Sequence, residues 1–356
     1  MRDILMVGAG VANLGAAWLL QRAGFSVTIL EQATAGSGAS GAAGGMLSPS
    51  AELRFGEEEL LKIELESVSL WPHFVKDLEE DSGISVQYRP HGTMLLAVTR
   101  DDLAAIDHTL SYRKEVGLPV VRMSSEECRD MEPRVSPRVH GGLYFPEDHQ
   151  VDATLLVQAL VQAFVKHGGV LCEGKQVQRL NVVDNGVQGV TLSDGEVVGA
   201  DCVVLGPGAW LRFMDELDVD VPKIRPVRGQ MISVQGGIEL CRRVVRSPRV
   251  YLVPKSNGRL TIGSTMEEVG FDDRLTAGGV RNLLENAREV LPDVEETNIV
   301  SFWTGFRPVS ELNRPIVETS ATRGLVWSIG HGRHGILLAP WTAATLERCV
   351  HRSVTA

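Results

Sequence analysis

The sequence predicts an α/β fold with two domains, one built on a parallel sheet and the other, of α+β type, on a mostly antiparallel sheet. A strand, a glycine turn, a helix and a second strand are expected at 4–31. An apolar strand that ends in a glycine turn follows much later, at 200–210, and would rejoin the first sheet. Alternating segments with turn signals lie between and after these parts, so the first domain is predicted to be discontinuous.

The first unit begins with the apolar run Ile4–Val7, which is typical of a buried parallel strand. Gly8 and Gly10 follow at once, where the strand must turn sharply into a helix. Gly24 is expected to end that helix, because glycine readily adopts a left-handed conformation. A second strand, Val27–Leu30, completes a Rossmann-like unit.

This unit is suited to a dinucleotide. Glycines let backbone N–H groups approach a pyrophosphate at the helix N-terminus, and Glu31 stands where an acid accepts the ribose hydroxyls. Asn13 replaces the third glycine of the usual motif, with a further glycine at Gly15. Asn13 either pushes the helix outward or forms its own hydrogen bond in the turn. An ordinary βαβ unit without a ligand is the alternative, which the spacing to Glu31 disfavours.

Bulk composition narrows the class of protein. The 356 residues, 44% of them hydrophobic, predict about two domains with a sizeable core. No apolar run approaches the roughly 20 residues of a transmembrane helix. The first strand starts close to Met1, which leaves no room for a signal peptide and predicts a cytoplasmic protein. A net charge of −10 without a basic cluster argues against nucleic-acid and anionic membrane partners. The five scattered cysteines predict neither disulfides nor a metal site.

The segment Ala35–Glu52 is too rich in glycine and alanine to be a packed element of its own. Two interpretations remain, a flexible linker or a close-packed loop that passes over the pyrophosphate. The second is favoured by the position directly after Glu31, where only small residues and hydroxyls such as Ser37 and Ser40 fit.

Amphipathic periodicity predicts one or two surface helices over 57–81, interrupted at Pro72, with Trp71 and Phe74 in the core. The chain then departs from the first domain. The elements expected there are a strand, turn and strand over 86–98, a helix over 101–115, a short capped helix over 124–133 and a strand over 141–145.

Asp152 is expected to cap an apolar helix over 155–166. Two turn signals within 170–201 predict a three-stranded meander, which leads to the strand at 200–210. The last elements expected are strands over 226–234, 251–254, 258–267 and 298–307, a helix over 283–291, a strand and turn over 324–335 and a helix over 336–349.

No Ser, His and Asp set or metal-spaced cluster stands out, so the difficult chemistry is expected to come from a cofactor. A bound dinucleotide then points to flavin redox chemistry. A second dinucleotide motif for a nicotinamide is missing. Electrons are therefore expected to come directly from a small substrate and to leave to oxygen or a carrier.

Several motifs resemble the D-amino-acid oxidase superfamily of FAD enzymes, and within it the glycine oxidase group of thiamine biosynthesis. The resemblance spans nearly the whole chain. The matching segments are AAGGML at Ala42–Leu47, PVRGQ at Pro226–Gln230, YLVP at Tyr251–Pro254, GRLTIGSTME at Gly258–Glu267, WTGFRP at Trp303–Pro308 and GHGRHGILLAP at Gly330–Pro340.

This resemblance implies an FAD-binding domain of residues 1–84, 146–222 and 320–356 and a substrate-binding domain of residues 85–145 and 223–319. It implies non-covalent FAD, because the cysteine that covalent members use near the C-terminal glycine turn is missing from 301–348. The implied cofactor contacts are Gly8, Gly10, Val11, Ala12, Asn13, Glu31, Gln32, Ser40, Gly44, Gly45, Met46, Leu47, Val177, Gly206, Gly208, Trp210, Arg307, Gly332, Arg333, His334, Gly335 and Ile336.

The resemblance also implies the substrate contacts. Arg307 would hold the substrate carboxylate in a bidentate salt bridge, and Tyr251 would donate a hydrogen bond to it. Arg333 would help to hold the carboxylate or the reduced ring, and Met266 would line the side-chain end of the pocket. Each has a structural alternative: a surface ion pair for Arg307, core positions for Tyr251 and Met266, and a helix N-terminus for Arg333.

The implied reaction is oxidative deamination of glycine and other small amines or amino acids to the 2-oxo acid, ammonia and hydrogen peroxide, with molecular oxygen as acceptor. The first product, an imine, would supply thiamine biosynthesis. Alternatives are a broader D-amino-acid or sarcosine oxidase, a dehydrogenase that passes electrons to a quinone, and a non-catalytic flavin-binding module. A homotetramer is what the family suggests.

Overall fold

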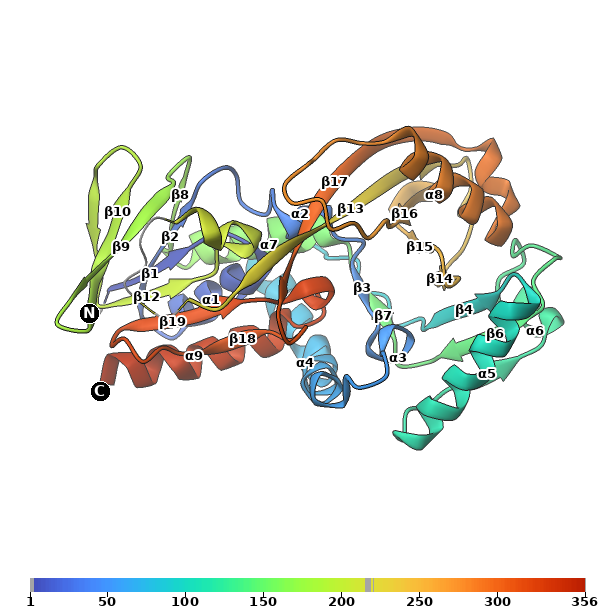
Figure 1. Cartoon of the computed structure of the whole chain (residues 1–356), viewed down its shortest axis with the longest axis horizontal. Coiled ribbons are helices and arrows are strands. Elements are labelled where there is room, and N and C mark those ends of the chain that lie inside the picture. The colour runs from blue at the N-terminus through green and yellow to red at the C-terminus, as the bar shows by residue number, and fades with distance from the viewer. Residues whose placement is uncertain (1–2, 215–218, 220, 356) are drawn as a thin grey trace.

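The computed structural model describes residues 3–214, 219 and 221–355 (Figure 1). Among them, one sheet has six strands in the order β18-β19-β12-β1-β2-β8. All neighbouring pairs are parallel except β18 with β19. The strands are β1 (Asp3–Val7), β2 (Ser26–Glu31), β8 (Val170–Glu173), β12 (Cys202–Leu205), β18 (Ile316–Thr319) and β19 (Leu325–Ile329).

Helices cover one face of this sheet, and a small antiparallel sheet covers the other. The helices are α1 (Val11–Arg22), α4 (Glu58–Ser82), α7 (Ala153–Lys166) and α9 (Ala339–Thr355). Their apolar side chains, Trp18, Trp71 and Phe74 among them, form one continuous core. On the other face, β9 (Val177–Val183), β10 (Gly186–Leu192) and β11 (Val197–Gly199) contribute to a second core. The predicted α/β class is therefore confirmed.

The second large sheet lies beside the first (Figure 1). Within the described ranges its order is β17-β13-β16-β15-β14-β4-β6-β5, antiparallel except where β14 pairs with β4. Its strands are β4 (Thr93–Ala97), β5 (Val121–Met123), β6 (Gly141–Phe145), β13 (Ile224–Gln235), β14 (Val244–Arg246), β15 (Tyr251–Pro254), β16 (Arg259–Gly263) and β17 (Asn298–Ser310). Helices α5 (Arg100–Glu115), α6 (Ser125–Met131) and α8 (Ala277–Val290) accompany it. The exact division into two domains stays a prediction.

Residues 35–52 correct one expectation. This segment is close-packed, but it also forms elements of its own: helices α2 (Ala39–Ala42) and α3 (Pro49–Glu52), and strand β3 (Met46–Leu47), which pairs with β7 (His149–Gln150). Small residues are required at the packing contacts. A Cβ on Gly41 would lie 2.5 Å from the carbonyl oxygen of Gly36, and a Cβ on Gly305 of β17 would lie 2.4 Å from the Ala42 Cβ.

Two strand predictions were wrong in detail. Residues 170–173 belong to the large parallel sheet as β8, and the meander is formed by 177–199 alone. Residues 86–98 form one strand, β4, because Pro90 lacks an N–H for a ladder and Arg89 makes only an isolated bridge to Gln150.

Helix boundaries also differ from the sequence pattern. The helical pattern expected over 57–81 forms the single helix α4 (Glu58–Ser82), which continues through Pro72. Helix α8 starts at Ala277, well before Leu283, because Thr276 caps it and Gly279 packs on Gln230, where a Cβ would come within 2.6 Å. Helix α9 starts at Ala339, since tight turns occupy the residues before it.

Asn13 forms its own hydrogen bonds in the glycine turn. Its Nδ2 donates to the carbonyl oxygens of Val7 at 3.0 Å and Gly8 at 2.9 Å, and the side chain is 1% exposed. Space for it exists because the residue opposite, at the end of β12, is Gly206. A Cβ on Gly206 would lie 2.5 Å from both Asn13 side-chain termini, and one on Gly8 would lie 2.5 Å from the Gly206 oxygen.

This contact predicts a coupled pair of substitutions. Gly206→Ala should destabilise the protein by about 1–3 kcal/mol, because an added methyl overpacks a tight interior. In an Asn13→Gly background the same alanine should cost less, since its steric partner is gone. Thermal unfolding of the four variants tests this, with Gly199→Ala as control, where the nearest neighbour of a Cβ is 3.7 Å away. Equal losses in both backgrounds would contradict the predicted contact.

Candidate active site

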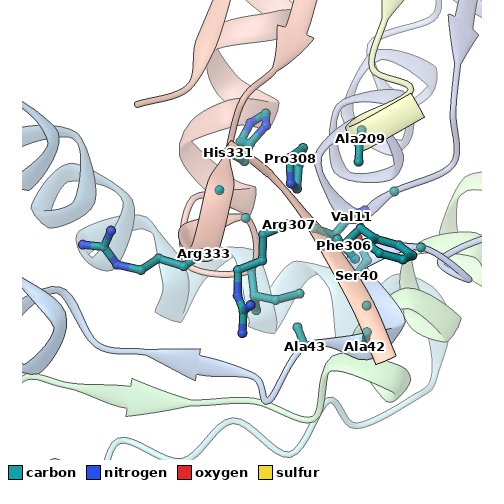
Figure 2. A pocket seen from close by; sticks show the side chains of 18 of the residues that line it. Val11, Ser40, Ala42, Ala43, Ala209, Phe306, Arg307, Pro308, His331 and Arg333 are labelled. Carbon is teal, nitrogen blue, oxygen red and sulfur yellow. Dashed lines mark hydrogen bonds between the residues drawn. The ribbon is translucent and has the colours of Figure 1, made fainter. Parts of the chain in front are cut away.

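A cavity of about 510 Å³ extends between the two large sheets. At one end it is lined by the turns that follow β1, β2 and β12, which are the carboxyl ends of parallel strands. At the other end it reaches β13, β15 and β17 of the second sheet. Figure 2 shows the Arg307 side chain extending from β17 toward Ala43, which directly follows α2. Crevices outside the carboxyl ends of open α/β sheets are where such folds bind ligands.

Glu31 is fixed at the first end of the cavity. Its Oε2 accepts from the Ala9 N–H at 2.8 Å and its Oε1 from the Ala33 N–H at 2.9 Å. Each carboxylate oxygen keeps further lone pairs for a ligand hydroxyl. The hydroxyl of Ser40 accepts from the Val11 N–H at 3.0 Å, which joins α2 to the start of α1. The geometry fits a ribose at Glu31 and a phosphate near the α1 N-terminus.

Most predicted cofactor contacts come together around this cavity, although their chain positions are far apart. The residues that line it are Gly8, Gly10, Val11, Ala12, Glu31, Gln32, Ser40, Gly44, Gly45, Met46, Val177, Gly206, Gly208, Trp210, Arg307, Gly332, Arg333, Gly335 and Ile336.

Three predicted cofactor contacts do not line the cavity. Asn13 points behind the glycine turn, and Leu47 is fully buried in the core. His334 is buried beside Glu64, with 2.6 Å between Nδ1 and Oε1. Neighbouring residues of a helix, a strand or a turn point to different sides of the backbone, which a sequence motif does not display.

The second end of the cavity brings Arg307 and Tyr251 together with Met266. The Arg307 Nη2 donates to the Ser264 Oγ at 2.5 Å, and its Nη1 donates to the Thr265 carbonyl at 3.4 Å. No carboxylate of the described residues pairs with this guanidinium. Gly229 on the neighbouring strand leaves room for it, because a Cβ there would come within 2.6 Å. Arg307 is therefore a cation that can accept an anionic ligand.

Tyr251 is held between two glycines, Gly44 and Gly263, at which a Cβ would lie 3.0 and 2.5 Å from its ring. Its hydroxyl lies 3.2 Å from the Met231 sulfur. Burial raises the pKa of this phenol, although Arg307 opposes the rise, so Tyr251 stays protonated and can donate a hydrogen bond.

Arg333 points away from Arg307 in Figure 2. Its Nη2 donates to the Glu57 Oε2 at 2.5 Å and to the Glu52 carbonyl at 3.2 Å. Burial raises the pKa of Glu57, but the bonds from Arg333 outweigh it and hold that pKa below its usual range. Arg333 thus lines the cavity, but Glu57 compensates its charge. Arg333 therefore fits the predicted contact with the substrate carboxylate less well than Arg307 does.

Sequence reasoning missed several polar residues of the lining. Arg246 forms an ion pair with Glu52, at 2.9 Å, and Arg54 lies beside Met266. Burial raises the pKa of Glu52, but Arg246 above all holds it below the usual range. His331 is buried, and burial lowers its pKa to about 4, so its ring is neutral. His331 lies within the matching segment Gly330–Pro340, which gave it no role, whereas Arg54 and Arg246 lie outside the matching segments, and their partners are distant in the sequence.

Comparison with known proteins shows to which family this chain belongs. A family model described as FAD dependent oxidoreductase (DAO) matches residues 3–348. Glycine oxidase of Geobacillus kaustophilus is 34% identical over 99% of this chain and 94% of that protein. Its crystal structure matches with a TM-score of 0.92 at 32% identity, covering 99% of this chain and 95% of the other. The bifunctional protein ThiO/ThiG of Trichormus variabilis is 33% identical over 97% of this chain, which matches 52% of its length.

The geometry at Glu31 predicts a loss of cofactor affinity on Glu31→Gln. The amide keeps the shape but loses the charge and one acceptor oxygen, so FAD should bind about tenfold more weakly. Fluorescence titration of the apoprotein with FAD measures this. Glu173→Gln is a matched control, because Glu173 on the adjacent strand also accepts from a backbone N–H, that of Ala35, but lies outside the cavity lining. Equal affinity for all three proteins would contradict the assignment.

Proposed function

Since the chain belongs to the DAO family of FAD-dependent oxidoreductases, we propose that it catalyses the oxidative deamination of glycine and other small amino acids. The observation that carries the proposal is that Arg307, which has no carboxylate partner in the described structure, lies with Tyr251 at one end of the cavity. Relatives of 34% and 33% identity that are named glycine oxidase and ThiO/ThiG support glycine as the substrate.

The residues present fit FAD. A Cβ on Gly8 would collide with Gly206, and the turn places Gly10, Val11 and Ala12, at the start of α1, in the cavity lining. We propose that Glu31 holds the adenosine ribose and that the α1 N-terminus with Ser40 holds the pyrophosphate. Residues Gly44–Met46 and Gly332–Ile336 would enclose the flavin ring, because both stretches, apart from His334, line the cavity.

When bound, FAD supplies the two-electron oxidant for the Cα–N bond of the substrate. Arg307 would bind the α-carboxylate through its planar fork, and the Tyr251 hydroxyl would donate a further hydrogen bond to it. Two fixed contacts orient the Cα hydrogen, which is the main catalytic contribution expected of these side chains. The amine enters neutral, so its lone pair forms the C=N bond of the imine as hydride leaves Cα, and no protein base is required there.

Hydrolysis of the imine then gives glyoxylate and ammonia. With oxygen as acceptor the balance is glycine, oxygen and water to glyoxylate, ammonia and hydrogen peroxide. We propose that the imine, before hydrolysis, supplies the thiazole part of thiamine biosynthesis. Use of oxygen and a homotetramer are further proposals that rest on the family resemblance, and a cytoplasmic location also stays a proposal. In the part of the chain that the structure describes, no helix is long and apolar enough to span a membrane.

Replacement of Arg307 tests the proposal. Arg307→Ala should reduce kcat/KM for glycine by at least about a hundredfold, because each charge-assisted hydrogen bond contributes about 1.5–3 kcal/mol. Arg307→Lys should recover little, since an ammonium cannot form the bidentate contact. Peroxide release measures activity, and retained flavin absorbance shows that the fold is intact. Arg225→Ala, on β13 but outside the cavity lining, is the control. Unchanged turnover of Arg307→Ala on glycine would refute the proposal.

We also expect FAD to be dissociable. The cysteines Cys128, Cys202, Cys241 and Cys349 are buried, and none of the five lines the cavity. Acid precipitation of the yellow protein should therefore release the flavin into the supernatant. Flavin that stays in the protein pellet would show a covalent bond and contradict the expectation.

A further inference from the structure

The cavity carries more positive charge than one carboxylate needs. Besides Arg307, the arginines 54, 246, 249 and 333 line it toward the second sheet. Three of these are compensated. Arg246 pairs with Glu52, Arg333 pairs with Glu57, and Arg249 is held by both oxygens of Asp102 at 3.0 and 2.9 Å.

Arg54 differs from these three. Within the described ranges, no carboxylate lies within 4.0 Å of its guanidinium, and the contact found is to the Met266 sulfur at 3.9 Å. Arg54 is exposed at the cavity mouth, whereas Arg307 lies deeper. Among the lining arginines, the two without an acid partner therefore share one space.

The backbone around Arg54 is held in place from several sides. Arg113, which is 3% exposed, donates to the Ser50 carbonyl and to the Leu53 carbonyl, both at 2.6 Å. The Arg54 N–H itself donates to the Glu57 Oε2 at 3.0 Å. Further polar contacts reach α3 from Asp148, Arg246 and Arg333. A fixed backbone with an uncompensated guanidinium at the cavity wall is a suitable geometry for a ligand contact.

Arg54 and Arg307 contact the same short segment of the cavity wall. Arg307 contacts Ser264 and Thr265, and Arg54 contacts Met266, the next residue. Met266 directly follows Thr265, so both guanidinium groups contact the wall segment 264–266. A molecule with two acidic groups a few bonds apart could meet both.

We propose that Arg54 is a second anion-binding residue of the substrate cavity and gives the enzyme a preference for small amino acids that carry another acidic group. This inference rests on the proposed function, in which Arg307 binds the α-carboxylate. The second carboxylate would lie either on the amine substituent, as in N-(carboxymethyl)glycine, or on the side chain, as in D-aspartate. The shared chemistry is a carboxylate at the end of the molecule remote from Arg307.

The kinetic test compares acidic substrates with neutral ones of similar shape. N-(carboxymethyl)glycine is measured against sarcosine, and D-aspartate against D-alanine, each relative to glycine. Arg54→Gln should lower the relative kcat/KM of at least one acidic substrate about tenfold, which corresponds to about 1.4 kcal/mol, chiefly through KM. The pair that responds shows which position the second carboxylate takes. Arg281→Gln, a 70% exposed position on α8 outside the lining, controls for the change in net charge.

A binding test separates this inference from the proposed function. The flavin absorbance of the holoenzyme is titrated with malonate and with acetate, neither of which has an amine to be oxidised. Malonate should bind more tightly than acetate, and Arg54→Gln should remove most of that preference. Such a result would support the inference even if glycine were not oxidised.

Three results would overturn the inference. The first is an equal preference for acidic substrates in Arg54→Gln and in the wild type. The second is malonate binding no tighter than acetate binding to the wild type. The third is loss of FAD from Arg54→Gln, which would mean that the guanidinium serves the cofactor.

Discussion

The structure depends on the close approach of two strand ends, those of β1 and β12. Gly8 lies against the Gly206 carbonyl, so neither position tolerates a side chain, and the Gly206 N–H donates to the Val7 carbonyl at 3.0 Å. Asn13 then uses the space beside Gly206 to satisfy two carbonyls of the same turn. Because the turn is closed from behind in this way, the N-terminus of α1 lines the cavity, where the helix dipole favours a phosphate.

The segment 35–57 connects the glycine turn of the first sheet with the second sheet. Its first part packs on β17, where the Trp303 indole N–H donates to the Ala42 carbonyl at 3.1 Å. Its later part forms the wall of the cavity that contains Glu52 and Arg54. Small side chains allow the first part to pass between two sheets, and buried charged groups hold the second part. The same stretch thus brings the proposed cofactor end and substrate end into one cavity.

The charges at the substrate end follow a pattern. Arg246, Arg249 and Arg333 each have an acidic partner that stabilises the wall, whereas Arg307 has hydroxyl and carbonyl partners instead. Arg307 is partly buried, and a buried charge without a partner is costly unless a ligand compensates it, whereas the exposed Arg54 is hydrated. The wall charges are therefore structural, and the uncompensated ones are available for binding an anion.

The sequence by itself determined the dinucleotide unit, the α/β class and the family resemblance, because glycine spacing, apolar runs and an acid at a fixed distance are local properties. It also identified Tyr251 and Arg307, which lie together in the cavity as expected. Only the tertiary structure decided that Asn13 satisfies its own turn, that Arg333 is paired with Glu57, and that Arg54 enters the cavity. Each of these depends on a partner distant in the sequence, and the direction of a side chain is fixed by packing that no local pattern encodes.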